Sequence, residues 1–220
     1  MINCAHLFKK SKICAFTRQD FNLDELNELE RQLSLTQITS HFHPKRREEF
    51  LLGRLAAKRA YLACTGTELK ELPVGDKRQP LWPNGVVGSI THSQTTILAA
   101  VALKEICTGV GIDLEFKNRV TPELTRMIFT DKDHALEHAM EDGLYRALVF
   151  SAKESLYKAL FPTVQLFFGF ETAALTGLDE KQGQFTITLQ KDLHPLYRTH
   201  REIDGRFHFT NTEILTVIEL

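Results

Sequence analysis

The sequence predicts an α+β fold made of two similar halves. Apolar residues at helical spacing over 44–64 are followed by three short segments rich in valine and isoleucine. The same order returns with a helical segment over 144–161, followed by four strand-like segments. Because the two helix-then-strands units have comparable length, we expect pseudo-symmetric α/β halves that meet near residues 110–120.

Two helices are expected before the first strands. Leucines recur at near-helical spacing in both segments, and acidic residues lie near the start of each, where the helix dipole favours negative charge. Pro44 suits the first position of the second helix, because its missing N–H needs no partner there, and Gly66 follows the expected end. The two helices are expected over 23–34 and 44–64.

A stretch rich in glycine and proline over 73–85 predicts a loop. The apolar segments after it are short and are bounded by glycine or polar clusters, which is typical of strands. The strands of the first half are therefore expected over 86–91, 96–103 and 108–115.

The C-terminal half is expected to contain three helices and four strands. An i,i+4 ladder of apolar residues from Leu144 to Leu160 predicts its longest helix. We expect Pro162 to end this helix, because proline lacks the N–H and its ring clashes with the preceding turn. The helices are expected over 121–128, 131–140 and 144–161, and the strands over 168–175, 184–189, 206–210 and 213–218.

Composition excludes several classes of protein. The 220 residues include 27 Lys plus Arg and 28 Asp plus Glu, so the basic excess of a nucleic-acid-coating protein is missing. The four cysteines have no CxxC spacing, which argues against disulfides and zinc and favours a reducing cytoplasm. The longest apolar run, over 97–103, is too short to span a membrane, and charged residues interrupt the N-terminus where a signal peptide would be apolar.

The first candidate site is the acidic pair Asp113 and Glu115. Side chains alternate along a strand, so both carboxylates should point to one face and repel each other unless a cation lies between them. Mg²⁺ suits that place, since it takes oxygen ligands from carboxylates and substrate phosphates. The alternative is an ordinary strand with one solvated face.

Glu154 and Lys158 form the second candidate. They lie four residues apart on one face of the expected helix. Alone, the pair is typical of a solvated helix surface. If this face meets the acidic strand across a cleft between the halves, Glu154 becomes a third magnesium ligand and Lys158 a partner for a phosphate.

Two further groups could bind phosphate. The segment 88–93 ends a strand with Thr91 and His92, whose side chains could join turn N–H groups around an anion. A Ser/His hydrolase is the competing idea, but the segment lacks the GxSxG pattern. The other group is a set of cations on the 44–64 helix and in the loop after it; it could grip phosphate or simply form a solvated flank. Its members are Lys45, Arg46, Arg47, Arg54, Lys58, Arg59, Lys77 and Arg78.

Taken together, these motifs resemble one known family. The segment Gly111-Ile112-Asp113-Leu114-Glu115, followed by Ala152-Lys153-Glu154-Ser155-Leu156-Tyr157-Lys158-Ala159, is similar to the paired signature of the 4′-phosphopantetheinyl transferases. The segments 46–54 and 80–93 are similar to blocks of the branch that activates siderophore synthases. The resemblance covers residues 44–175.

The resemblance implies an Mg²⁺-dependent transferase that moves phosphopantetheine from coenzyme A to a serine of an apo-carrier protein. It implies an active site in the cleft between two halves, 1–112 with the coenzyme A-binding elements and 113–220 with the metal-binding helix, which together form one catalytic unit. By match to the family, the metal ligands are Asp113, Glu115 and Glu154, and the catalytic residues are Glu154, Lys158 and Asp113. The matched coenzyme A contacts are Arg46, Arg54, Gly75, Asp76, Lys77, Thr91, His92, Lys158 and Phe168. Gln79 departs from the charged residue of many relatives, which puts a direct contact from that position in doubt.

The same resemblance implies a carrier domain of a peptide, polyketide or fatty-acid synthase as the partner. From the charge balance and the short apolar runs, we expect neither nucleic acid nor a membrane as a partner. Candidate residues for an apolar docking patch are Met127, Phe129, Phe161 and Phe167. With both halves in one chain, we expect a cytoplasmic monomer, with Mn²⁺ as an alternative metal. A protein that binds coenzyme A without catalysis and an Mg²⁺-dependent phosphohydrolase are the other functions to be tested.

Overall fold

The computed structural model describes residues 4–220, so residues 1–3 of the expected first half lie outside the described part of the chain. The chain divides into two compact units, Met1–Thr108 and Gly109–Leu220. Each unit has its own antiparallel sheet, its own long helix and its own apolar core, which confirms the α+β class. The boundary expected between residues 112 and 113 falls inside strand β4 (Val110–Phe116), all of which pairs with one strand of the second unit.

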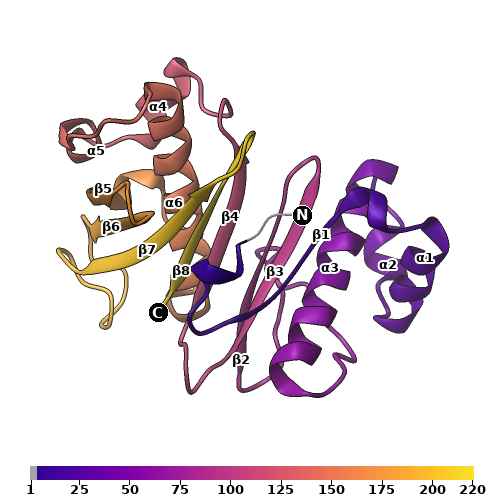
Figure 1. The fold of residues 1–220 in the computed structure, drawn as a ribbon. Coiled ribbons are helices and arrows are strands. Elements are labelled where there is room, and N and C mark those ends of the chain that lie inside the picture. Colours follow the sequence, from indigo (N-terminus) through magenta and orange to yellow (C-terminus); the bar gives the residue numbers. More distant parts are fainter. Residues whose placement is uncertain (1–3) are drawn as a thin grey trace. The chain divides into compact units, whose positions relative to one another are not determined.

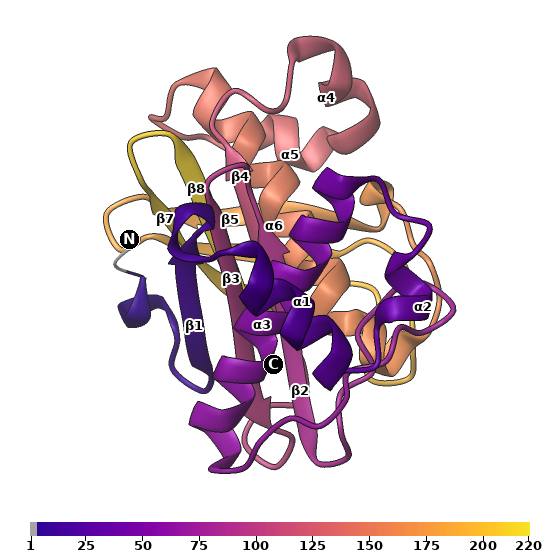
Figure 2. The ribbon, with the colours of Figure 1, turned by 90° about the vertical axis from the view of Figure 1, so that its right-hand side faces the viewer.

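The first unit is a three-stranded sheet with a long helix packed against it. Its strand order is β1-β3-β2, and both pairings are antiparallel. Helices α1 and α2 lie beside α3 on the side away from the sheet (Figures 1 and 2). The elements are η1 (Ala5–Leu7), β1 (Lys12–Thr17), η2 (Arg18–Asp20), α1 (Leu23–Gln32), α2 (Thr36–Thr39), α3 (Pro44–Thr65), β2 (Val86–His92) and β3 (Thr96–Leu103).

Helix α3 begins and ends where its sequence predicts. Pro44 occupies the first turn, and Gly66 takes the left-handed conformation (φ 72°) that closes the last turn at little steric cost. Leu51, Leu52 and Ala56 are fully buried in the core of the first unit. Strand β1 was missing from the sequence prediction because its six residues lie within mixed sequence; its pairing with β3 decides its conformation.

The second unit is a five-stranded sheet covered by one long helix. The strand order is β4-β8-β7-β6-β5, antiparallel throughout, and α6 packs against β4 and β8 (Figure 1). The helices are α4 (Pro122–Ile128), α5 (Asp131–Ala135), α6 (Asp142–Val164) and η3 (Phe170–Thr172). The remaining strands are β5 (Ala173–Asp179), β6 (Gln184–Leu189), β7 (Glu202–Phe209) and β8 (Glu213–Glu219).

Several element boundaries in this unit differ from the sequence prediction, and β7, for example, begins at Glu202 rather than at 206. Helix α6 continues through Pro162 to Val164, because a proline in the last turn removes only one hydrogen bond and the Gln165 N–H still closes the turn on the Phe161 carbonyl. Helix α5 ends at Ala135 rather than near residue 140, and the backbone becomes extended at the next residue. The strand expected from 168 begins at Ala173, after the short helix η3.

One glycine brings α6 and β4 into close contact. A Cβ at Gly111 would overlap the backbone carbonyl of Ser155 in α6. The side-chain hydroxyls of Ser151 and Ser155 also bond to Thr216 of β8, with an oxygen–oxygen distance of 2.7 Å for Ser155. Glycine at this position therefore lets the helix lie directly on the strand that carries the acidic pair.

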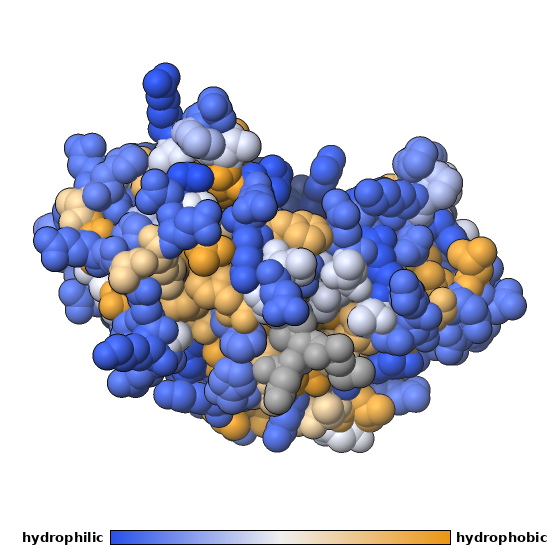
Figure 3. Space-filling model, turned by 45° about the horizontal axis from the view of Figure 1, so that its top comes forward, coloured by the Kyte–Doolittle hydropathy of each residue, from blue (hydrophilic) through white to orange (hydrophobic). Residues whose placement is uncertain are grey.

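Within the described residues, no helix combines the length and apolar character needed to cross a membrane. The face shown in Figure 3 is mostly polar and charged, with apolar side chains in small groups.

Candidate active site

The second unit brings the predicted acidic residues together with Lys158. Asp113 and Glu115 alternate onto the face of β4 that α6 covers, and Glu154 and Lys158 extend from α6 one turn apart. Lys158 Nζ donates to Asp113 Oδ1 at 2.7 Å and to the Ile112 carbonyl at 2.9 Å. The four side chains predicted for the acidic site thus come from two elements of one unit, and Lys158 and Asp113 are in direct contact.

The charges of this cluster act on one another. The pKa of Glu115 rises to about 7, chiefly because the side chain is buried and then because Asp113 and Glu154 repel its negative charge, while Arg119 and Lys158 oppose the shift. Burial, followed by the charge of Asp113, also raises the pKa of Glu154. The three carboxylates therefore repel one another, and the positive charges of Arg119 and Lys158 offset this repulsion only in part.

The donor chemistry of the cluster fits a hard divalent cation. Asp113 is buried, and its second carboxylate oxygen, Oδ2, has no hydrogen-bond partner among the described residues. An orphaned carboxylate oxygen beside two mutually repelling carboxylates is the ligand type that Mg²⁺ prefers. In the described part of the chain, however, no three acidic, histidine or cysteine side chains are gathered in a geometry that could hold a metal ion.

An aromatic pocket of about 210 Å³ lies next to Glu154. Its walls include Tyr157, Phe167, Phe168 and Phe170, and the Tyr157 and Phe168 rings have their centroids 5.0 Å apart. The pocket is mostly apolar, and Lys153 and Glu154 are the charged residues among those that line it. Such a pocket can hold a flexible chain of low polarity beside the acidic cluster.

Arg54 in the first unit is a buried cation that lacks protein partners for part of its guanidinium group. Its side chain lies 4.4 Å from the centroid of the Phe50 ring, and Nε and Nη2 have no hydrogen-bond acceptor among the described residues. Burial, and then the charge of nearby Arg46, lowers the pKa of Arg54 to about 10. A buried guanidinium with unused donors is suited to an anionic ligand such as a phosphate.

Other cations of α3 differ from Arg54. Arg47 donates to the carboxylate of Glu30 through Nε (3.0 Å) and Nη2, so two nitrogens of its guanidinium group already have an acceptor. Arg46 is exposed and lies 3.9 Å from Glu49 Oε2. The spacing in the sequence could not show which of these arginines is already paired, because the partner carboxylates come from Glu30 in α1 and from Glu49 in α3. Arg47 therefore already has a carboxylate partner in α1, and its proposed contact with a phosphate stays a prediction.

The loop with Gly75, Asp76 and Lys77 is organised by Gln79. The Gly75 N–H donates to the backbone carbonyl of Gln79 (2.8 Å), and the Lys77 N–H donates to its side-chain oxygen (3.0 Å). Asp76 and Lys77 are exposed at the turn. Gln79 therefore shapes this loop.

Thr91 and His92 lie at the end of β2, where Thr91 is buried and His92 is half-buried. They belong to the first unit together with Arg46, Arg54 and the 75–77 loop. The acidic cluster and Phe168 belong to the second unit, so each unit carries its own part of the predicted set.

Two family models match the chain. The model described as the 4′-phosphopantetheinyl transferase N-terminal domain matches residues 34–102, and that of the 4′-phosphopantetheinyl transferase superfamily matches residues 109–212. The two matched regions together cover most of the chain.

Individual relatives agree with these models. Enterobactin synthase component D of Salmonella typhi is 39% identical over 138 residues, which cover 61% of this chain and 56% of the relative. The 4′-phosphopantetheinyl transferase Svp of Streptomyces mobaraensis is 36% identical over 150 residues (66% and 60%), and PptT of Mycobacterium tuberculosis is 35% identical over 134 residues (60% and 59%). The chain spans little more than half the length of these curated relatives.

Proposed function

Because the chain belongs to the 4′-phosphopantetheinyl transferase superfamily, we propose that it transfers phosphopantetheine from coenzyme A to a serine of an apo-carrier protein. The observation that carries the proposal is the cluster of Asp113, Glu115, Glu154 and Lys158, in which Lys158 bonds to Asp113 at 2.7 Å while burial and the charge of Asp113 raise the pKa values of Glu115 and Glu154. A role in siderophore or other secondary-metabolite synthesis is also proposed, and it is supported by the name of one relative, enterobactin synthase component D.

In the proposed reaction, Glu154 accepts the proton of the carrier serine hydroxyl, directly or through a water. The serine oxygen forms a bond to the phosphorus of the phosphopantetheine, and the bond from that phosphorus to the departing 3′,5′-adenosine bisphosphate breaks. A carboxylate whose pKa is raised by burial is a better base near neutral pH than an exposed one. Lys158, held against Asp113, positions a phosphate oxygen.

Asp113, Glu115 and Glu154 would hold the divalent ion of the reaction, Mg²⁺ or Mn²⁺. When bound, such an ion polarises the phosphate and offsets the negative charge that develops on the leaving group. In the first unit, Arg46, Arg54, the 75–77 loop, Thr91 and His92 are proposed to bind coenzyme A. Lys158 and Phe168 are the proposed contacts from the second unit.

We propose that the carrier docks on exposed apolar side chains of the second unit. Met127 is 74% exposed and Phe167 is 79% exposed, whereas Phe161 is 5% exposed and belongs to the core. Phe129 is partly buried against the apolar core of the second unit. Of the four residues suggested by the sequence, Met127 and Phe167 therefore remain as candidate contacts.

We further propose that the chain acts as a monomer in the cytoplasm. All four cysteines are free, as is usual in reducing compartments. Both groups of proposed ligands are carried by one chain, so the reaction as proposed needs no second copy.

The function is tested by incubating the protein with MgCl₂, coenzyme A and an apo-carrier protein and then weighing the carrier. A mass increase of one phosphopantetheine supports transfer. Free phosphopantetheine without a change in the carrier indicates a phosphohydrolase, and bound but unchanged coenzyme A indicates a binding protein.

Arg54→Met should have opposite effects on stability and on coenzyme A binding. Removing a buried charge that lacks full pairing should raise the free energy of unfolding by about 1–3 kcal/mol. Loss of charge-assisted bonds to phosphate should raise the KM for coenzyme A about tenfold or more. Thermal unfolding and steady-state kinetics measure the two effects, with Lys58→Met on the same helix as the control. A destabilised variant with an unchanged KM contradicts this role for Arg54.

Glu115 should make the metal-free protein less stable as the pH rises. Its folded pKa of about 7 lies above the ordinary value of 4.5, so the contribution of Glu115 to stability is greatest below about pH 4.5. That contribution is lost as the pH rises through 7 and the carboxylate ionises beside Asp113 and Glu154, despite Arg119 and Lys158. Glu115→Gln should therefore raise the free energy of unfolding at pH 8 by at most about 3 kcal/mol and change it little at pH 4.5. Urea unfolding with EDTA at both pH values measures the difference. An equal effect at the two pH values would exclude this cause.

A further inference from the structure

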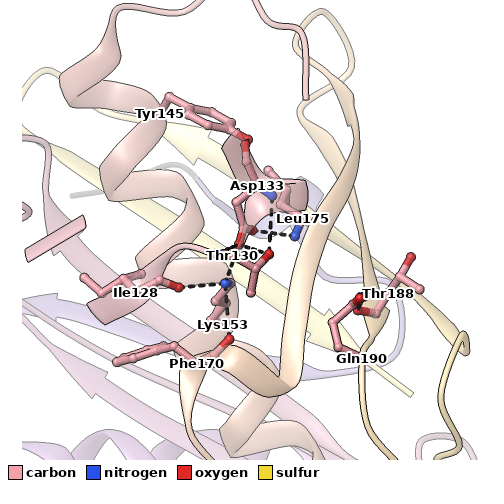
Figure 4. A network of polar contacts seen from close by, with 9 residues as sticks. All are labelled: Ile128, Thr130, Asp133, Tyr145, Lys153, Phe170, Leu175, Thr188 and Gln190. Carbon is pink, nitrogen blue, oxygen red and sulfur yellow. Dashed lines mark hydrogen bonds and ion pairs between the residues drawn. The ribbon is translucent and has the colours of Figure 1, made fainter. Parts of the chain in front are cut away.

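The second unit contains a buried ion pair beside the proposed active site that the mechanism above does not use. Lys153 Nζ donates to Asp133 Oδ2 at 2.7 Å, to the Ile128 carbonyl at 2.7 Å and to the Phe170 carbonyl at 3.2 Å (Figure 4). The side chains of Lys153 and Asp133 are 2% and 0% exposed. All three ammonium hydrogens therefore have partners inside the protein.

The Asp133 carboxylate is equally well satisfied. Oδ2 also accepts from the backbone N–H and the hydroxyl of Thr130 (2.6 and 2.7 Å), and Oδ1 accepts from the Leu175 N–H at 2.7 Å (Figure 4). The pair thus joins α6 to the end of α4, to α5, to η3 and to β5. The sequence signal for Asp133 is its place three residues after Thr130, which forms a capping box at the start of α5.

A second contact fixes α6 against α5. The Tyr145 hydroxyl donates to the Asp133 backbone carbonyl at 2.7 Å, and the ring of His138 stacks on the Tyr145 ring with centroids 3.7 Å apart. Tyr145 and Lys153 lie about two turns apart on the same helix. Two points of attachment along one helix oppose its rotation about its own axis.

That rotation decides where Glu154 points. Lys153 and Glu154 are neighbours in α6, and successive side chains on a helix differ in direction by about 100°. Lys153 donates to groups of α4, α5 and η3. Glu154, in contrast, lies close enough to Asp113 on β4 for the charge of Asp113 to raise its pKa. On the strand side, the Ser151 hydroxyl donates to the Asp113 carbonyl at 3.3 Å.

The same pair also holds one wall of the aromatic pocket. Phe170, whose carbonyl accepts from Lys153, lines that pocket together with Lys153, Glu154, Tyr157 and Phe168. The position of the wall relative to the carboxylate therefore depends on the same ammonium group.

We infer that the Asp133–Lys153 pair is a positioning device for Glu154, which fixes the direction of that carboxylate toward Asp113 and Glu115. The inference rests on the proposed transferase function. Lys153 and Asp133 are positioning residues in this role; they act through the rotation of α6.

The test uses the double variant Asp133→Leu/Lys153→Met. Removing one partner alone would leave a buried unpaired charge, whereas replacing a buried pair by apolar residues often preserves the fold. We expect a melting temperature close to that of the parent, an unchanged KM for coenzyme A and a kcat lowered about tenfold or more, as is typical when supporting residues of a site are lost. The isosteric Asp133→Asn is measured beside it in case the double variant does not fold, and we expect it to show a smaller loss of kcat in the same direction. Lys191→Gln/Glu171→Gln, which removes an exposed ion pair of the same unit, is the matched control and should leave kcat unchanged.

A mutant cycle separates positioning from a general structural effect. Each variant is also made in the Glu154→Gln background, where no carboxylate remains to be positioned, and single-turnover transfer is measured. We expect the pair's removal to lower the rate less than about twofold in that background. The same fold loss in both backgrounds, or full activity of the Asp133→Leu/Lys153→Met protein, overturns the inference.

A binding measurement keeps this result separate from the proposed function. Mn²⁺ alone is titrated into the four proteins of the cycle and followed by electron paramagnetic resonance. We expect the pair's removal to weaken Mn²⁺ binding about tenfold when Glu154 is present and little when it is Gln. If the folded parent transfers nothing to any carrier, the proposed function fails, and the Mn²⁺ cycle alone decides the inference: equal affinity of the parent and the double variant overturns it.

Discussion

We expect Glu154→Gln to lower the rate of phosphopantetheine transfer by about 10²–10⁴-fold, because the amide cannot accept the proton of the carrier serine. Coenzyme A binding should change little, since the cations proposed to bind it lie on other residues. The rate is measured by weighing the carrier after timed reactions, and coenzyme A affinity is measured by calorimetry.

The same substitution should not destabilise the protein. It removes one negative charge from a cluster in which the pKa of Glu115 is already raised to about 7, so the melting temperature of the metal-free protein should stay the same or increase. Glu171→Gln, at an exposed position of the same unit, is the control and should transfer at the parent rate. A Glu154→Gln protein that transfers as fast as the parent rejects Glu154 as the base.

We expect Gly111→Ala to produce the largest loss of stability among single substitutions near the site, about 3 kcal/mol or more. The added Cβ would overlap the Ser155 carbonyl in the backbone of α6, and backbone cannot move aside as a flexible side chain can. The helix must then shift away from β4, which also separates Glu154 from Asp113. Urea unfolding measures the loss of stability.

Gly143→Ala is the matched control, because its Cβ would meet only ordinary contacts of 3.7 Å or more in the first turn of the same helix. This variant should have the stability of the parent or slightly more, since alanine favours helices by up to about 1 kcal/mol over glycine. If Gly111→Ala unfolds at the same urea concentration as Gly143→Ala, close packing of α6 on β4 is not needed for stability.

Long periodic segments made most of the secondary structure predictable. The apolar ladders of α3 and α6 and the runs of valine and isoleucine in β2, β3 and β4 lie where the sequence places them. The prediction was wrong where the sequence shows no clear apolar periodicity, as in β1, and where Pro162 alone was expected to end a helix. Strand β1 depends on pairing with β3, and Pro162 lies close enough to the end of α6 that the helix tolerates it.

The acidic site was predictable in part. Alternation along a strand places Asp113 and Glu115 on one face, and a spacing of four places Glu154 and Lys158 on another. That the two faces meet depends on contact between β4 and α6, which the chain separates by some forty residues. The 2.7 Å bond between Lys158 and Asp113 is the direct evidence of that contact.

By itself, the sequence determined the fold class, the long helices, the strand alternation and the residue types that chemistry on a phosphate requires. Only the tertiary structure decided which charged side chains are already paired within the protein and which have donors left for a ligand. Arg47 is paired with Glu30, and Lys153 is buried against Asp133, whereas Arg54 has N–H groups without an acceptor among residues 4–220. The physical reason is that the pairing of a charge is set by groups from elements distant along the chain, whereas periodicity reports only on neighbours within one element.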